Sequence, residues 1–256
     1  MRHTPTRLAA LTGLVGVSIL LTACTSAPAA EVGEPIEGGT LTYASGDSEP
    51  TCLDPHVGGN YPQGMLSTQY MESLVSRNDQ GQIVPWLATS WEEDTDGLGW
   101  EFTLRDDVSF TDGTAFTAEA VQENVAHLQD PNTGSSTGFL ALGKVIDTEA
   151  VSDTVVRLEL REPDSALLES LSQPWLGMQS PTALERGQDE NCLAPVGTGP
   201  FIVDNWVKQN AVSLLRNDDY TSPPADAAHD GPAYLDSVVW RFIPESATRY
   251  AALQAG

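Results

Sequence analysis

Side chains with catalytic potential are few and scattered along the chain. The segment GSSTG at residues 134–138 matches the nucleophile-elbow pattern, in which Ser136 would be an exposed nucleophile. That pattern needs a strand before the serine, whereas this segment follows a predicted helix and the pair Pro131-Asn132. A serine hydrolase that uses Ser136 is therefore a disfavoured alternative, and we predict that the protein is not an enzyme.

Metal and phosphate chemistry finds no support in the spacing of polar residues. His56, His127 and His229 each lack a second ligand at metal-binding spacing. The aspartates at 94 and 96 and at 106 and 107 could attract calcium, but turns at the edges of strands are the simpler explanation. No phosphate-binding loop of the GxxxxGK type is present. We expect no cofactor and no resident metal.

Cys24 is the side chain whose chemistry is best indicated by its neighbours, because it stands at the end of an N-terminal leader segment. Arg2 and Arg7 precede a charge-free, mostly apolar run over residues 8–21, which continues into LTAC. The run is short for a bilayer span and is typical of an export signal. Its end resembles the bacterial lipobox, whose cysteine is acylated and becomes the first residue. We expect residues 1–23 to be a lipoprotein signal peptide and Cys24 to carry lipid; an uncleaved membrane anchor is the alternative.

Cys52 and Cys192 remain once Cys24 is assigned to lipid. In an oxidising compartment a disulfide is the default expectation for such a pair. The bridge would bring the segment after the first strand next to one far downstream, so the chain would leave one domain, build another and return. Two independent buried thiols are the alternative.

The composition is strongly acidic. The 256 residues contain 36 Asp and Glu against 12 Lys and Arg, a net charge of -24, and cleavage of the signal would remove two arginines and give -26 (10 minus 36). Such a surface repels phosphate, so nucleic acid is excluded as a partner. Residues 24–37, rich in Ala, Pro and Glu, predict a flexible tether. The 219 residues after it suffice for one large domain or two small ones.

Apolar periodicity in the folded part predicts a mixed α/β fold. Residues alternate as in half-buried strands at 40–44, 100–104, 156–160, 201–206, 212–216 and 238–242. Thr117 is a predicted N-cap for a helix with Ala118, Val121, Val125 and Leu128 on its inner face. Leu66, Tyr70 and Leu74 recur at i+4 and predict a helix that ends near Val75, and Ser246 starts a last helix.

Several ordered motifs resemble family 5 extracellular solute-binding proteins, the oligopeptide, dipeptide and nickel receptors of ABC importers. The motifs are LDPH (53–56), LATSW (87–91), WEFTLRDDVSF (100–110), TDGTAFTAE (111–119), PVGTGPF (195–201), RNDDY (216–220) and AALQAG (251–256). They extend over the chain from about Gly38 to its last residue.

The resemblance implies a periplasmic-binding-protein type II-like fold, in which two lobes close over a solute. The first lobe would consist of a main domain, residues 38–62 plus 190–256, and an inserted subdomain, residues 63–189. Family members are about twice as long, so we expect the second lobe to be missing from a fragment or truncated gene product. Because lobe closure cannot then contribute, we expect weak or undetectable solute affinity for this polypeptide.

The resemblance also implies a function and candidate ligand-binding residues. The protein would be a monomeric substrate-binding lipoprotein on the extracytoplasmic face of the cell membrane, which delivers a peptide or similar small solute to an ABC permease and ATPase complex. Loops that the family places between its lobes contain Tyr61, Gln63, Phe139, Trp175 and Met178.

Alternatives remain for those residues and for the function. Trp175 and Met178 could equally fill core beside Leu171, and Asp54 and the segment 197–200 are better explained as turn formers than as ligand contacts. Nickel chelates, opines and sugars are alternative solutes. A surface adhesion or scaffold lipoprotein with a vestigial cleft is a second functional class.

Overall fold

Two four-stranded sheets organise the computed structural model, which describes residues 33 and 35–255. The strands are β1 (Thr40–Ser45), β2 (Val75–Arg77), β3 (Ile83–Pro85), β4 (Ala88–Glu93), β5 (Gly99–Leu104), β6 (Val145–Ser152), β7 (Val155–Leu160), β8 (Phe201–Val207), β9 (Ala211–Arg216) and β10 (Ser237–Phe242). The helices are α1 (Tyr61–Ser67), α2 (Ala118–Gln129), α3 (Thr137–Ala141), α4 (Leu167–Leu171), the 3₁₀ helix η1 (Pro174–Leu176), α5 (Pro181–Glu185), α6 (Gln188–Asn191) and α7 (Ser246–Ala255). The mixed α/β class is as the sequence predicts.

The first sheet joins the start of the chain to its end. Its strand order is β1-β10-β9-β8, with β1 parallel to β10 and the other pairs antiparallel. Strands β8 and β9 form the expected hairpin, which turns at Gln209 with φ 62°. A core of its own lies against this sheet and includes Leu53, Leu66, Tyr70 and Trp240. Residues 53–71 therefore pack with strands that come from the last third of the chain.

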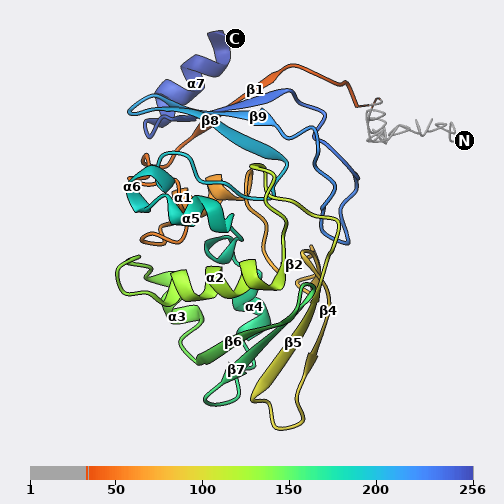
Figure 1. Cartoon of the computed structure of the whole chain (residues 1–256). Helices are drawn as coiled ribbons and strands as arrows, with labels where there is room; N and C mark the ends of the chain where they lie inside the picture. The colour runs from red at the N-terminus through yellow and green to blue at the C-terminus, as the bar shows by residue number, and fades with distance from the viewer. Residues whose placement is uncertain (1–32, 34, 256) are drawn as a thin grey trace, which may run out of the picture. The chain divides into compact units, whose positions relative to one another are not determined.

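The second sheet is antiparallel and comes from the middle of the chain. Its order is β4-β5-β7-β6, and α2 packs on β6 and β7 (Figure 1). The alternation predicted for β5 is confirmed, since Trp100, Phe102 and Leu104 are buried. Thr117 caps α2, because its side chain accepts a hydrogen bond from the N–H of Ala120. The larger of the two cores fills this region.

The helix predicted from Leu66, Tyr70 and Leu74 ends much earlier, because α1 stops at Ser67 and Val75 starts a strand. All three side chains are buried, as their spacing suggests. The backbone after Ser67, however, pairs with another segment: Gly199 donates to the carbonyl of Tyr70 over 3.1 Å, and Phe201 to that of Gln69 over 3.0 Å. A Cβ at Gly199 would lie 2.6 Å from the carbonyl carbon of Tyr70, so only glycine permits this approach. Hydrogen bonds from residues 199 and 201 to residues 69 and 70 therefore take the place of the helix predicted here.

Helices α1, α5 and α6 lie between the two sheets, where the chain passes from one to the other (Figure 1). A disulfide joins Cys52, in the loop after β1, to Cys192, directly after α6. It spans 140 residues of sequence and confirms the pairing predicted for these two cysteines. The expected signal peptide 1–23 and Cys24 lie outside the described residues, as does most of the tether. Within the described part of the chain, no helix is both long and apolar enough to cross a membrane.

Candidate functional site

Two loops from distant parts of the chain meet in a short parallel bridge between Gly58 and Ser135. The amide of Gly58 donates to the carbonyl of Gly134 over 3.2 Å, and the amide of Ser136 returns a bond to the carbonyl of Gly58 over 3.0 Å. The hydroxyl of Thr137 donates to the carbonyl of Gly59 over 3.2 Å. We call residues 57–59 and 133–136 the loop bridge. It fixes where α1 and α3 begin.

Helix α1 starts beside the loop bridge with a well-formed cap. The side-chain oxygen of Asn60 accepts from the amide of Gln63 over 3.1 Å, and Pro62 occupies the first turn, where no intrahelical N–H is needed. The indole N–H of Trp175, on η1, donates to the carbonyl of Asn60 over 3.1 Å. A Cβ on Gly64 would lie 3.0 Å from that indole ring, so the ring packs directly on the α1 backbone.

The outer side of this region exposes large apolar side chains. Tyr61 is 59% exposed, Phe139 47% and Leu140 78%, while Trp175 is half-buried between them, since η1 contacts both α1 and α3. We call Tyr61, Phe139, Leu140 and Trp175 the α1–α3 surface. Aromatic side chains that remain exposed on a braced backbone are typical of a binding surface.

The structure thus brings together three of the five residues proposed from the sequence. Gln63 and Met178 occupy different environments. Gln63 is buried: its amide donates to the carbonyl of Cys52 over 3.0 Å, and its oxygen accepts from the amide of Gly59 over 3.3 Å. Met178 is buried in the larger core. Tyr61, Phe139 and Trp175 are the three that reach the outer side of this region.

Ser136 has no catalytic partner in the described part of the chain. Its hydroxyl donates to the carbonyl of Gly58, within the loop bridge, and no histidine nitrogen is hydrogen-bonded to it. The segment enters from the end of α2 and not from a strand. The hydroxyl therefore braces the bridge, and the geometry of a nucleophile elbow is missing.

Three titratable residues that look isolated in the sequence meet beneath the loop bridge. The carboxylate of Asp54 accepts from the amide of His56 over 2.8 Å, from Gln179 over 2.5 Å and from Asn191 over 2.9 Å. His127 places its Nε2 3.8 Å from the Oδ2 of Asp54, and the two imidazole rings are 5.5 Å apart. We call Asp54, His56 and His127 the buried triad. Spacing gave no sign of it, because His127 comes from α2 and the other two come from the first loop.

The described residues contain no group of three or more His, Cys, Asp or Glu side chains arranged to hold a metal ion. In the buried triad, the oxygens of Asp54 are instead engaged by the two amide side chains and a backbone N–H. Burial alone would raise the pKa of Asp54, but the histidines and the backbone N–H of His56 outweigh it and hold that pKa below its ordinary value. Asp54 is therefore a carboxylate at neutral pH.

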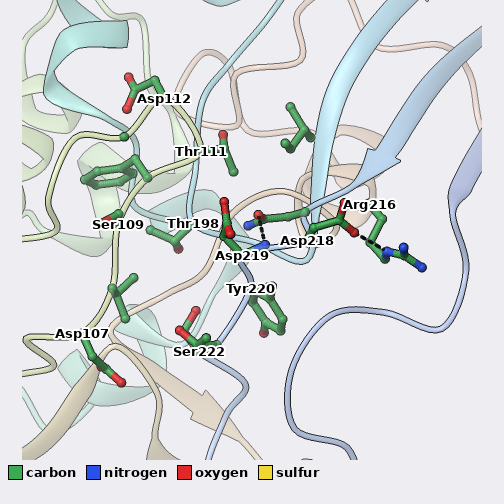
Figure 2. Close-up of a pocket in the computed structure, with 16 residues that line it drawn as sticks. Asp107, Ser109, Thr111, Asp112, Thr198, Arg216, Asp218, Asp219, Tyr220 and Ser222 are labelled. Atoms are coloured by element: carbon green, nitrogen blue, oxygen red, sulfur yellow. Dashed lines mark hydrogen bonds and ion pairs between the residues drawn. The ribbon is translucent and has the colours of Figure 1, made fainter.

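A second candidate is a cavity of about 700 Å³ between residues 107–113 and 216–222 (Figure 2). Its walls carry Asp107, Asp112, Asp218 and Asp219, and its one arginine, Arg216, is paired with Asp218 over 2.7 Å. Four aspartates and a paired arginine make the cavity unsuited to an anionic solute, while Val108, Phe110 and Ile202 add apolar surface to its lining.

Behind this cavity lies a buried carboxylate, Glu72. Its oxygens accept four hydrogen bonds, from the indole of Trp86 over 2.9 Å and from the hydroxyls of Thr198 over 2.8 Å, Tyr220 over 2.7 Å and Ser222 over 2.6 Å. Burial raises the pKa of Glu72 to about 7, although the four donors oppose the shift. Glu72 ties the segment after β9 to the start of the second sheet.

The comparison with protein families decides the assignment. The model of the bacterial extracellular solute-binding proteins, family 5 (middle region), matches residues 82–256. This chain belongs to that family. Phe139 and Trp175 fall inside the matched range of this family 5 chain, whereas Tyr61 and the buried triad's Asp54 and His56 precede it.

Relatives of this family 5 chain include characterised binding proteins. The glutathione-binding protein GsiB of Shigella flexneri is 32% identical over 206 residues, which are 80% of this chain and 39% of GsiB. The peptide-bound DppA of Helicobacter pylori superposes with TM-score 0.75 at 30% identity, over 87% of this chain and 46% of DppA. AgaA of A. tumefaciens R10, bound to agropinic acid, superposes with TM-score 0.75 at 28% identity, over 85% of this chain and 42% of AgaA. The chain has the periplasmic-binding-protein fold and spans less than half the length of these relatives.

Proposed function

We propose that this chain captures a peptide or peptide-like solute outside the cytoplasm and delivers it to the permease and ATPase of an ABC importer. Family membership supports this class, and the relatives include one named for glutathione and one solved with a peptide. The observation that carries the proposal is the α1–α3 surface, where Tyr61 and Phe139 stay exposed beside a hydrogen-bonded loop bridge.

Chemically, this surface offers aromatic faces and carbonyl groups but no charged side chain of its own. Tyr61, Phe139, Leu140 and Trp175 would cover apolar or planar parts of a solute, such as peptide groups and side chains. The carbonyls of Gly58 and Gly59 are already bonded to Ser136 and Thr137, so the bridge is rigid before any solute arrives. In this proposal, the groups that contact the charged ends of a solute lie outside the α1–α3 surface.

The test follows the indole N–H of Trp175 by NMR, after assignment through Trp175→Phe. We expect this resonance to shift on titration with the tetrapeptide Ser-Thr-Ser-Ala or with glutathione, at concentrations up to the millimolar range because the surface is open. Indole resonances of Trp206 and Trp100, outside the α1–α3 surface, serve as internal controls. If all indole resonances respond equally, or none responds to either solute, the α1–α3 surface is not the binding site.

The proposal extends to the organisation and location of the protein. Residues 38–62 with 190–256 would act as a main domain and 63–189 as an inserted subdomain, a division supported by the origin of the two sheets. Cleavage before Cys24 and acylation of that cysteine would anchor the protein at the membrane. Mass spectrometry of the N-terminal peptide tests this: a Cys24→Ala variant should lose the acyl mass and leave the membrane fraction, and an unmodified Cys24 in the parent protein would exclude the anchor.

A further inference from the structure

Gln63 uses every hydrogen-bonding position of its buried carboxamide, which has two donor hydrogens and two acceptor lone pairs. Its Nε2 donates to the carbonyl of Cys52 over 3.0 Å and to the carbonyl of Asp54. Its Oε1 accepts from the amide of Gly59 over 3.3 Å and from Nδ2 of Asn60 over 3.3 Å. Because carbonyls only accept, a flipped carboxamide would set its oxygen against two other oxygens. The orientation is therefore fixed, and no atom of the group is left for a solute.

All four partners of Gln63 lie in one segment, residues 52–60, which leads from the disulfide to α1. The first end of this segment is anchored independently of Gln63. Cys52 is held by the disulfide, and the amide of Leu53 donates to the carbonyl of Cys192 over 2.8 Å. The other end passes into α1 through its N-cap. Gln63 therefore ties the anchored end of the segment directly to the end from which α1 starts.

The bond to Gly59 carries this tie to α3. The carbonyl of Gly59 accepts from the hydroxyl of Thr137, the first residue of α3, over 3.2 Å. The two residues are in close contact, because a Cβ on Gly59 would collide with that hydroxyl. Gly59 also has a φ of 106°, which side chains other than that of glycine rarely adopt. One side chain on α1 thus holds the residue against which α3 begins.

We propose that Gln63 is a positioning residue for the α1–α3 surface: its carboxamide sets the shape of residues 52–60 and thereby the placement of Tyr61, on α1, relative to Phe139, on α3. Helix α1 has seven residues, too few to be stable on its own, so its placement depends on contacts of this kind. Gln63 acts without touching the solute. The effect on solute affinity rests on the proposed function, whereas the effect on the two helices does not.

The first experiment needs no solute and follows native-state NMR signals, which a loss of stability alone does not move. Gln63→Met keeps the length of the side chain and removes its four hydrogen bonds. We expect the Trp175 indole and the Phe139 amide to shift relative to the parent. Gln122→Met is the matched control, because Gln122 donates to the carbonyl of Thr148, between α2 and β6. Signals that stay in place in Gln63→Met, or that shift equally in the control, would overturn the proposal.

Gln63→Glu separates the acceptor from the donor and guards against misfolding of Gln63→Met. Its carboxylate can accept from the amide of Gly59 but cannot donate to the carbonyl of Asp54. Protonation restores one donor hydrogen, and burial favours this neutral form. We therefore expect the Trp175 and Phe139 signals of Gln63→Glu to be displaced at pH 7.5 and to return toward those of the parent at pH 5.

The titratable groups around position 63 are taken into account in this comparison. Burial favours a higher pKa for Asp54, but the neighbouring histidines and the amide of His56 outweigh it and keep this pKa below its ordinary value. Burial raises the pKa of Tyr70 well above its ordinary value. His56 and His127 are also present in the parent, which is recorded at both pH values as the reference. A Gln63→Glu variant that matches the parent at pH 7.5, or that stays displaced at pH 5, would overturn the proposal.

The solute arm titrates Ser-Thr-Ser-Ala at pH 7.5, read at the Trp175 indole. We expect affinity about fivefold lower in Gln63→Met than in the parent, at the low end of couplings between sites, and unchanged affinity in Gln122→Met. Equal affinity in the parent and Gln63→Met would overturn the link to solute binding. A parent that binds no peptide, with the expected signal shifts present in Gln63→Met, would contradict the proposed function and leave the positioning of the two helices supported.

Discussion

The indole N–H of Trp175 donates to the backbone carbonyl of Asn60, across 115 residues of sequence. This bond joins η1 to the cap of α1, and so it sets where Tyr61 projects. The α1–α3 surface is assembled by contacts of this kind, between segments that share no local sequence pattern. Its members can be tested one at a time, because Tyr61, Phe139 and Leu140 are exposed.

Replacement of Trp175 by Phe should separate the hydrogen bond from the packing of the ring. The phenyl ring can still lie on Gly64, but the donor to Asn60 is lost. We expect the free energy of unfolding to fall by about 1 kcal/mol, as for a single hydrogen bond, measured by urea denaturation. Solute affinity should fall as well. Trp206→Phe, on β8, removes the bond that the indole donates to Glu49 in the loop after β1, and affinity should be unchanged in this variant. Equal losses of affinity in both variants would speak against a specific role for Trp175.

Truncation of the exposed aromatics should affect binding more than stability. Tyr61→Ala and Phe139→Ala remove side chains that are 59% and 47% exposed, so we expect unfolding free energies within about 0.5 kcal/mol of the parent. Each should weaken peptide binding by about tenfold, the scale of a lost aromatic contact. Tyr250→Ala, at a 65% exposed position on α7, is the matched control. Unchanged affinity in both test variants would remove the α1–α3 surface as the binding site.

Glu72 should make stability depend on pH in a defined direction. Its pKa rises from 4.5 to about 7 on folding, so its contribution is complete below pH 4.5 and is lost as the pH rises through about 7. The shift corresponds to roughly 3 kcal/mol between those limits. Glu72→Gln should flatten this part of the profile, because an amide can donate to the hydroxyls of Thr198 and Ser222 and does not ionise.

The profile is measured as the free energy of unfolding from pH 4.5 to 8.5. Glu169→Gln is the control, since Glu169 is exposed in its ion pair with Arg77 and should leave the slope unchanged. A parent protein whose stability rises across pH 7, or a Glu72→Gln variant with the parent's slope, would show that Glu72 is not the group responsible.

Loss of the disulfide should be costly, because the bond spans 140 residues. In the chain-entropy model the double variant Cys52→Ser/Cys192→Ser loses about 5 kcal/mol of stability. Thermal unfolding with and without reductant provides the measurement: reductant should lower the melting temperature of the parent to that of the variant. If reductant lowers the melting temperature of the double variant equally, its effect does not come from this bond.

Much of the fold could be predicted from local pattern. The alternation at Trp100, Phe102 and Leu104 and the cap at Thr117 depend on neighbours in sequence, and both agree with the structure. The i+4 spacing of Leu66, Tyr70 and Leu74 predicted burial correctly and helix wrongly. Backbone groups of residues 69–70 bond to residues 199–201, and periodicity carries no information about so distant a partner.

The candidate site could be predicted only in part, for the same reason. Tyr61, Phe139 and Trp175 were proposed from their segments, and the structure assembles them through the loop bridge and η1. Gln63 was proposed with them but is buried, where its amide joins Cys52 to Gly59. The meeting of His127 with Asp54 had no sequence signal, because it requires α2 to pack beneath the first loop.

The sequence by itself determined the family motifs, the acidic charge and most of the elements, since each follows from residue type and short-range spacing. It also predicted the pairing of Cys52 with Cys192, because these two cysteines remained once Cys24 was assigned to lipid. Only the tertiary structure decided which aromatics stay exposed, where Gln63 and Met178 lie, and that Asp54, His56 and His127 form one cluster. Those outcomes depend on contacts between residues tens to hundreds of positions apart, whose geometry is fixed by packing of the whole domain.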